Sequence, residues 1–318
     1  MSVAIPQQWN RRPVMRWGAL LMMLWVFVTV PPDSTDAHEI AVLKSADIAA
    51  YNQAVAGLKA ELPDSSTITE YDMQGDVSRG RKLARKIRAS DASVVITVGL
   101  KAALVAKLEI VDVPIIYCMV LDPAKYDLHA PNMTGISLQV PIARQFGTMQ
   151  LVLPNLKKIG VVYDPEKTGP FVEDARQVAK GLGFELVERQ VSSEKELPAA
   201  LRAIVSKVDA FWLIPDSTIL TEESLRFVLS TALDRNVPVI GFSSEFVRNG
   251  ALVGLSVNSE DIGKQAGAMA RRILKGQNAA PPATVPPDRV RFALNLKTAK
   301  FLGLELPSEV VGRADEVY

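Results

Sequence analysis

The sequence predicts an α/β fold with two doubly wound parallel sheets. Beyond residue 38, short apolar runs alternate with longer segments whose apolar residues recur at intervals of three and four. Runs such as ASVVITV (92–98) are mostly apolar, which is typical of parallel strands covered by helices on both faces. About four such runs precede residue 135 and about four more end before residue 245, so the sequence favours two sheets over one.

Residues 1–37 have the pattern of a secretory signal peptide. Arg11, Arg12 and Arg16 precede an apolar run at residues 17–30, and Thr35 and Ala37 form a small-x-small cleavage site. The run is shorter than the ~20 residues that a membrane-spanning helix needs, although a membrane anchor is the alternative. We predict cleavage after Ala37 and a periplasmic location for the remaining chain.

The first half of the remaining chain predicts alternating strands and helices. Apolar residues at Ile48, Tyr51, Val55 and Leu58 share one helical face, which is typical of a helix packed on a sheet. The expected strands are residues 40–43, 66–71, 92–99 and 113–120, and the expected helices are residues 46–62, 77–89 and 101–108.

The second half repeats this alternation and adds a different tail. The expected strands are residues 158–164, 184–191, 209–215 and 237–242, and the expected helices are residues 169–182, 194–207 and 221–236. A short strand at 251–256, a helix at 261–275 and an alternating edge strand at 289–296 follow. Periodicity alone does not say where these last elements pack.

The composition favours a neutral or small-molecule partner. The chain has 36 basic and 35 acidic residues, spread along its length, so no electrostatic footprint of a nucleic-acid-binding protein is present. Cys118 is the only cysteine, which excludes an internal disulfide. The 48% hydrophobic content is enough for well-packed cores.

Small, hydroxyl-bearing and acidic residues follow several predicted strands, at the sheet edge where α/β proteins bind ligands. They are Lys44 and Ser45, Gly99, Asp122, Asp164, Asp216 to Thr218, and Phe242 to Glu245. For some of these residues the alternative to ligand binding is a role in a turn. Asp122 and Asp164 precede proline in turn-forming pairs, and Gly99 suits a tight turn. Ser45 is also a plausible N-cap for a helix that begins at Ala46.

The stretch FWLIPDST (211–218) gives the most specific prediction. The helix after it can be capped by Thr221, with Glu222 and Glu223 in its first turn, so Asp216 and Ser217 are not needed as caps. A carboxylate at the end of a central strand needs a cation or several donors nearby. A ligand ammonium and a protein Lys or Arg are both candidates.

Enzymatic patterns are weak. The chain has two histidines and one cysteine in an apolar run, which argues against a His/Cys metal site or a cysteine nucleophile. Gly241 and Ser243 lack the second glycine of a nucleophile elbow. A carboxylate pair such as Asp122 and Asp216 is conceivable for acid–base chemistry on a sugar, but its spacing does not favour catalysis over binding.

With these residues in place, the chain resembles the substrate-binding proteins of ABC transporters, in the branch with the type I periplasmic binding fold that includes tryptophan- and tyrosine-binding members. The segments that carry the resemblance are MTGIS (133–137), VLPNLKKIGVVYDP (152–165), VDAFWLIPDSTI (208–219), residues 237–276, and LNLKTAKFLGLELPSEVVGRADEV (294–317). The resemblance extends from about Ile40 to Val317 and is specific for the family rather than for a ligand.

The resemblance implies two lobes joined by three crossovers, near residues 135–142, 243–252 and 280–288. The N-terminal lobe would comprise residues 38–140 and 247–284, and the C-terminal lobe residues 141–246 and 285–318. A monomer of this kind closes around a small-molecule ligand between its lobes and delivers it to an ABC transporter permease, without a cofactor or a metal.

The resemblance also implies a set of ligand-binding residues: Ser45, Gly99, Asp122, Asp216, Ser217, Phe242, Ser243, Ser244 and Ser256. In amino-acid-binding members a carboxylate meets the ligand ammonium, and Asp216 fits this role. Lys44 departs from the His-Pro-containing turn of the aromatic-amino-acid binders. It either favours an anionic ligand or points to solvent.

Two other functions remain open at this stage. A sensory binding module would use the same lobes but would dock a kinase or chemoreceptor, and an exported enzyme would convert its ligand. No residue in the sequence separates a transport receptor from a sensor, because the docking surface is not recognisable without its partner.

Overall fold

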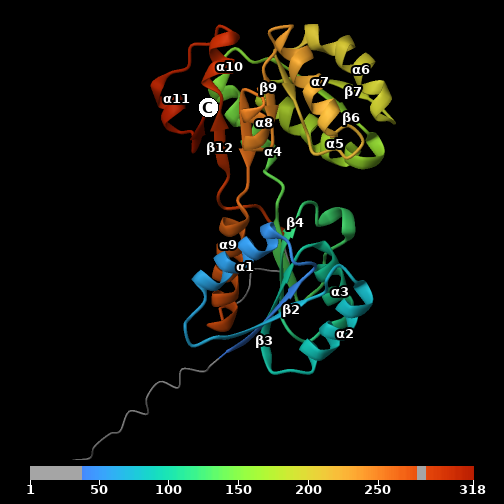
Figure 1. Ribbon diagram of the computed structural model, residues 1–318, viewed down its shortest axis with the longest axis vertical. Coiled ribbons are helices and arrows are strands. Elements are labelled where there is room, and N and C mark those ends of the chain that lie inside the picture. Colours follow the sequence, from blue (N-terminus) through green and yellow to red (C-terminus); the bar gives the residue numbers. More distant parts are fainter. Residues whose placement is uncertain (1–37, 278–283) are drawn as a thin grey trace, which may run out of the picture. The chain divides into compact units, whose positions relative to one another are not determined.

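The computed structural model describes residues 38–277 and 284–318, so the predicted signal peptide lies outside the described residues. Within them the strands form a six-stranded and a seven-stranded sheet (Figure 1), and the predicted α/β class with two parallel sheets is confirmed. The strands of the first sheet are β1 (Glu39–Lys44), β2 (Thr67–Asp72), β3 (Ala92–Val98), β4 (Ile115–Val120), β5 (Met133–Ser137) and β11 (Thr284–Val285). Those of the second are β6 (Lys158–Tyr163), β7 (Glu185–Gln190), β8 (Ala210–Trp212), β9 (Val239–Gly241), β10 (Val253–Ser256), β12 (Arg291–Leu294) and β13 (Glu316–Val317).

Helices connect most of these strands. They are α1 (Ala49–Glu61), α2 (Val77–Arg88), α3 (Leu100–Glu109), α4 (Ile142–Val152), α5 (Pro165–Leu182), α6 (Leu197–Ile204), α7 (Glu222–Leu233), α8 (Ser244–Arg248), α9 (Ser259–Leu274), α10 (Leu296–Phe301) and α11 (Ser308–Gly312), with short 3-10 turns at Ala124–Tyr126, Glu194–Glu196 and Val205–Lys207. None of the helices in the described ranges is long and apolar enough to cross a membrane.

The first sheet has the strand order β11-β5-β4-β3-β1-β2, and all its pairs are parallel. Successive residues of a strand face opposite sides, so β1 sends Ala41 and Leu43 into one apolar core and Ile40 and Val42 into another. Both faces of the central strands β1, β3 and β4 are therefore buried, which explains why these strands are mostly apolar, whereas the edge strand β2 is partly exposed.

The second sheet has the order β13-β12-β10-β9-β8-β6-β7. Its pairs are parallel except that β12 runs antiparallel to β10, with Arg291 opposite Ser256. The strands here also supply two cores, with Trp212 and Ile214 on one face and Phe211 and Leu213 on the other. Trp212 and Phe211 are among the largest fully buried side chains.

Side-chain caps start several of the helices. Thr221 caps α7 by accepting a hydrogen bond from Ser224 N at 3.1 Å, as predicted, and Glu222 and Glu223 lie in the first turn. Asp164 caps α5 by accepting from Glu166 N at 2.9 Å. This cap places the start of α5 at Pro165 rather than at residue 169, because proline is well suited to the first helical position.

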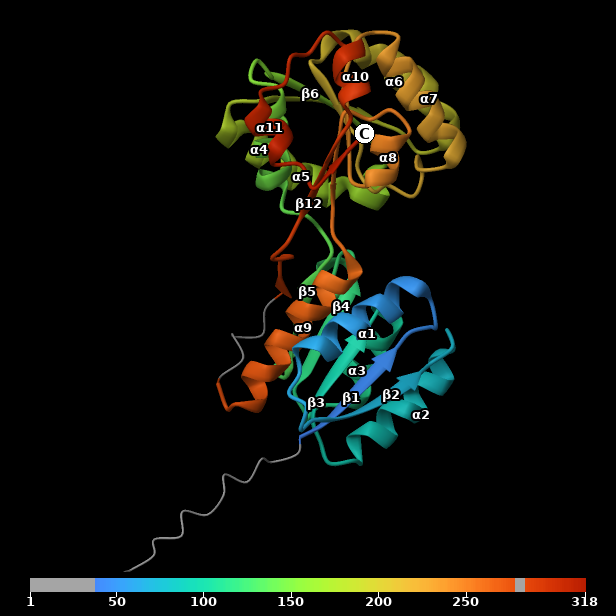
Figure 2. The ribbon, with the colours of Figure 1, turned by 60° about the vertical axis from the view of Figure 1, so that its left-hand side comes forward.

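Helices α1 and α9 lie side by side although they are distant in sequence (Figures 1 and 2). Glycines permit this close approach. A Cβ atom added at Gly263 would lie 1.9 Å from Ala54 O, and one at Gly57 would lie 2.1 Å from Glu260 O. Because α1 and α9 share a core with the first sheet, α9 packs on the sheet that the family resemblance implied.

Two predicted boundaries differ from the structure. The N-terminal lobe was expected to resume at residue 247, but β10 pairs with β9 and β12 in the second sheet, so the chain leaves that sheet only after Ser256. Apolar periodicity predicts a strand but not its neighbours. Helix α1 begins at Ala49 rather than at Ala46, and its N-cap residue Ile48 makes no side-chain capping bond.

Candidate functional site

Two buried carboxylates tie the ends of β6 and β8 together. Asp216 is 0% exposed and Asp164 is 4% exposed. Thr168 Oγ1 donates to Asp216 Oδ2 at 2.6 Å, and Thr218 Oγ1 donates to Asp164 Oδ2 at 2.6 Å. Each carboxylate thus accepts a hydroxyl from the loop or helix that carries the other. We refer to Asp164, Thr168, Asp216 and Thr218 as the Asp–Thr clasp.

Backbone donors complete the coordination of Asp216. Asp164 N donates to Asp216 Oδ2 at 2.8 Å, and Thr218 N donates to Asp216 Oδ1 at 2.9 Å. The sequence required either a cation or several donors for this carboxylate, and the structure provides three protein donors in all. Its predicted contact with a ligand ammonium stays a prediction. Ser217 is exposed beside the clasp.

The hydrogen bond from Thr218 lowers the pKa of Asp164, and the Glu166 N–H adds to this effect. A carboxylate with a depressed pKa in the folded state contributes stability that is present above its ordinary pKa of 3.8 and is lost as the pH falls below it. We therefore expect Thr218→Val to lower the free energy of unfolding at pH 7 and to flatten its pH dependence below pH 5. Urea unfolding between pH 7 and pH 3 measures both effects.

Thr168→Val is the matched control for this prediction, because Thr168 donates to the carboxylate of Asp216 and, of Asp164, contacts only the backbone carbonyl. It should leave the hydrogen bond from Thr218 to Asp164, and the part of the acid dependence that this bond supplies, unchanged. Parallel pH profiles for Thr218→Val and the unmodified chain would contradict the assigned role of Thr218.

Two of the predicted residues of the first sheet, Ser45 and Gly99, lie close together at the ends of β1 and β3. Ser45 is buried and its Oγ accepts from Ala102 N at 2.9 Å, so it ties β1 to α3 and does not cap α1. Gly99 has φ 93° and closely faces Ser45 Oγ and the Tyr51 hydroxyl, so a side chain there would meet both strain and a clash.

Lys44 does not point to solvent. Its side chain is only 12% exposed, and Nζ lies 3.4 Å from Glu70 Oε2 and donates to Asn52 Oδ1 at 3.0 Å. The charge of Lys44 is therefore balanced within the protein. Cys118, on β4, is inert, because burial raises the pKa of its thiol to about 12.

A cavity of about 390 Å³ lies at the carboxyl ends of β9 and β10. Four of the predicted residues line it: Phe242, Ser243, Ser244 and Ser256. Its size falls within the ~300–1,000 Å³ of typical ligand pockets. The remaining lining is mostly apolar and amide-bearing, and consists of Leu121, Leu138, Gln139, Val140, Gln145, Phe171, Pro215, Leu255, Val257, Asn258, Arg291 and Glu316.

Asp122 borders a different cavity of about 270 Å³, which shares Gln139, Val140 and Phe171 with the first. One oxygen of Asp122 accepts from Lys125 N at 3.1 Å, as the turn alternative predicted. Ser45, Gly99, Asp216 and Ser217 border neither cavity. The predicted residues around β9 and β10 therefore line one cavity, whereas Ser45 and Gly99 meet at the ends of β1 and β3, and Asp216 and Ser217 lie at the end of β8.

Trp212, a buried core residue, contacts two of the side chains that line the larger cavity. Its Nε1 donates to Gln145 Oε1 at 2.9 Å, and its ring lies 5.4 Å from that of Phe171. Gln145 and Phe171 both line the cavity. The other three tryptophans of the chain lie within residues 1–37. In a chain that begins at His38, tryptophan fluorescence therefore comes from Trp212 alone and reports on its contacts with Gln145 and Phe171.

Sequence reasoning missed Arg291, Glu316, Asn258 and the cavity's amide side chains. The alternation of RVRFALNL (289–296) predicted an edge strand, but β12 lies between β10 and β13, and β13 forms the edge. The antiparallel register of β12 on β10 places Arg291 opposite Ser256. In the described part of the chain, no group of three or more His, Cys, Asp or Glu side chains could hold a metal ion.

Comparison with known proteins gives consistent results. A family model described as ABC transporter substrate binding protein matches residues 39–318. A tyrosine-binding protein from Clostridioides difficile (strain R20291) is 25% identical over 250 residues, which cover 76% of this chain and 72% of the relative.

Two solved structures share the fold. A ligand-free, open substrate-binding protein with adhesive properties from Clostridium difficile matches with a TM-score of 0.75 and 24% identity, covering 88% of this chain and 99% of that chain. An ABC domain in complex with L-Trp from Streptococcus pneumonia matches with a TM-score of 0.58 and 24% identity, covering 88% of this chain and 100% of that chain.

Proposed function

The chain belongs to the family of ABC transporter substrate-binding proteins, and we propose that it captures a small, polar, amino-acid-like ligand in the larger cavity and delivers it unchanged to an ABC permease. The observation that carries this proposal is the cavity itself. Its hydroxyls and amides lie beside Phe242 and Phe171, so it offers polar groups for orientation and apolar surface for binding energy.

Two further observations support the ligand class. One relative is named as a tyrosine-binding protein, and one structure of the same fold holds L-Trp. An aromatic amino acid combines the apolar body and the polar end that the lining calls for. Residues 1–37 carry the pattern of a signal peptide, and we place the processed chain in the periplasm as a monomer.

A thermal-shift screen of residues 38–318 tests the proposal. All described elements lie in the compact unit Ala37–Tyr318, so this chain retains both sheets. The panel contains amino acids, small carboxylates, purines and sugars. A ligand at about 100 times its dissociation constant should stabilise the chain by about 2.7 kcal/mol. A panel in which no solute raises the melting temperature would contradict the proposed function.

Phe242→Ala should weaken binding of the best solute by about tenfold, which corresponds to about 1.4 kcal/mol of binding free energy. The reason is the loss of apolar contact area in the cavity. Phe301→Ala is the matched control, because Phe301 is 66% exposed on α10 and does not line the cavity. Isothermal titration calorimetry on both variants gives the comparison. Equal losses, or none for Phe242→Ala, would place the ligand elsewhere.

A further inference from the structure

Two of the side chains that line the larger cavity carry a charge, and they have opposite signs. Arg291 lies on β12 and Glu316 on the adjacent strand β13. Glu316 pairs with Ala293, which lies two residues beyond Arg291, so Arg291 and Glu316 project from the same face of the sheet. The two side chains form no ion pair with each other within 4.0 Å in the described structure. The lining therefore presents a cation and an anion that are separated.

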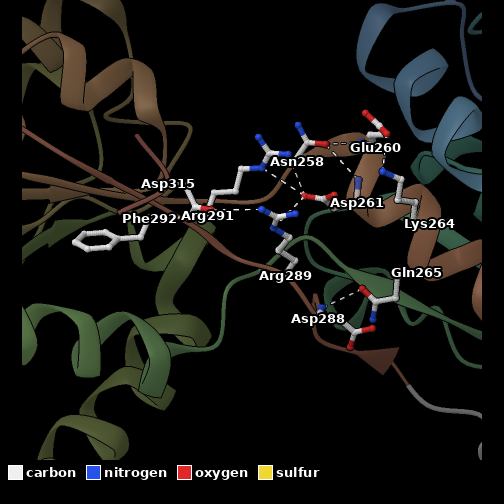
Figure 3. Close-up of polar contacts among 10 residues, drawn as sticks. All are labelled: Asn258, Glu260, Asp261, Lys264, Gln265, Asp288, Arg289, Arg291, Phe292 and Asp315. Atoms are coloured by element: carbon white, nitrogen blue, oxygen red, sulfur yellow. Dashed lines mark hydrogen bonds and ion pairs between the residues drawn. The ribbon is translucent and has the colours of Figure 1, made fainter. Parts of the chain in front are cut away.

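The charge of Arg291 is only partly engaged. Its Nη2 and Nε lie 3.2 and 3.4 Å from a single oxygen, Asp261 Oδ2, at the start of α9. Arg289 Nε lies 3.8 Å from the same oxygen. Figure 3 shows Asp261 between the two guanidinium groups, with Arg289 also reaching Asp315 at 3.5 Å. One carboxylate oxygen thus serves two arginines through long contacts.

A free edge remains on the Arg291 guanidinium. The side chain is 33% exposed, and among the described residues no hydrogen-bond partner is recorded for its Nη1. A guanidinium offers donors in a planar fork that matches a carboxylate, and such charge-assisted hydrogen bonds are about twice as strong as neutral ones. Arg291 is therefore suited to hold a carboxylate that enters the cavity.

Glu316 is suited to the opposite charge. Its Oε2 accepts a hydrogen bond from the Tyr318 hydroxyl, which leaves Oε1 for another donor. Within the described ranges, no Lys or Arg nitrogen lies within ion-pair distance of Glu316. Asp216, which the sequence placed opposite an ammonium, already accepts three protein donors and does not line the cavity, whereas Glu316 does.

We propose that the cavity selects zwitterions, with Arg291 binding the ligand carboxylate and Glu316 facing the ligand ammonium. This inference rests on the proposed function and names its charge selectivity. A lining with one cation and one anion has no net charge, so a dianion or a dication leaves a like-charge repulsion that a zwitterion avoids. The apolar and hydroxyl-bearing residues then contact the remainder of the molecule.

The test uses residues 38–318 and the twenty standard L-amino acids as probes. Two derivatives of the tightest-binding amino acid each lack one of its charges. The carboxamide has no carboxylate, and the N-acetyl derivative has no ammonium. Arg291→Gln should weaken the amino acid at least tenfold and its carboxamide less than twofold. Glu316→Gln should weaken the amino acid at least tenfold and its N-acetyl derivative less than twofold. Calorimetry gives the dissociation constants.

Arg289→Gln is the matched control, because Arg289 shares Asp261 with Arg291 but does not line the cavity. It should change the affinity for the amino acid less than twofold. Arg291→Lys keeps the positive charge but loses the planar guanidinium, so it should weaken the affinity for the amino acid by an intermediate amount. It also provides a second variant at this position if Arg291→Gln does not fold. Melting temperatures of all variants are measured alongside.

Three results would overturn the inference. Equal losses for the amino acid and its carboxamide in Arg291→Gln would show a structural role through Asp261. A loss in Arg289→Gln as large as that in Arg291→Gln would show the same. Binding of a sugar, purine or dicarboxylate but of no amino acid would refute zwitterion selection while leaving the receptor function intact. Binding of no solute at all would instead refute the receptor function itself.

Discussion

Replacing Asp216 by alanine is expected to lower the free energy of unfolding by about 3–5 kcal/mol, because three donors, one buried and two half-buried, lose their acceptor and each unsatisfied group costs about 1–3 kcal/mol. The donors are Asp164 N, Thr168 Oγ1 and Thr218 N, at 2.8, 2.6 and 2.9 Å from the carboxylate. Since Asp216 is fully buried, its removal leaves these donors facing a cavity rather than bulk water. Urea unfolding of residues 38–318, followed by Trp212 fluorescence, measures the change.

Ser217→Ala provides the control at the next position. Ser217 is exposed beside the clasp, so its replacement should change stability by no more than about 0.5 kcal/mol. If Asp216→Ala costs less than about 1 kcal/mol, the value of a single ordinary hydrogen bond, the clasp does not stabilise the second sheet.

Replacing Gly263 by alanine is expected to destabilise the chain by about 3 kcal/mol, at the upper end of the usual cost of overpacking. The added Cβ would lie 1.9 Å from Ala54 O and 2.7 Å from Ala54 C, and these backbone atoms of α1 cannot move aside as a flexible side chain can. Helices α1 and α9 must therefore separate, which opens the core they share with the first sheet. Differential scanning calorimetry gives the loss.

Gly147→Ala is the matched substitution for this test. Gly147 lies within α4, and a Cβ added there meets no atom within 4 Å. Alanine should therefore stabilise the helix by up to about 1 kcal/mol. Equal effects at Gly263 and Gly147 would show that the close approach of α1 and α9 does not limit stability.

The sequence predicted those features of the fold that arise from local patterns. Alternating apolar runs placed the parallel strands, and the cap at Thr221 was predicted together with its acidic first turn. The pattern failed where a local signal was misleading. The helix expected from residue 169 begins about one turn earlier, at Pro165, because Asp164 caps it, and it continues through Gly169 and Pro170.

The candidate site was less predictable because it depends on which strands become neighbours. Phe242 to Ser244 and Ser256 were predicted and line the cavity. Arg291 and Glu316 join them only because β12 turns antiparallel to β10 and carries β13 beside it, a pairing that no periodicity encodes. Asp216 shows a second reason. A buried carboxylate needs hydrogen-bond donors, but the sequence does not say whether the protein or a ligand supplies them.

The crystal structure of residues 38–318 with the tightest-binding solute from the screen tests the central claim most directly. We expect the ligand in the cavity of about 390 Å³, in contact with Phe242, Ser243 and Ser256. Its carboxylate should face Arg291. A ligand bound at full occupancy on another surface, with this cavity holding only water, would contradict the account.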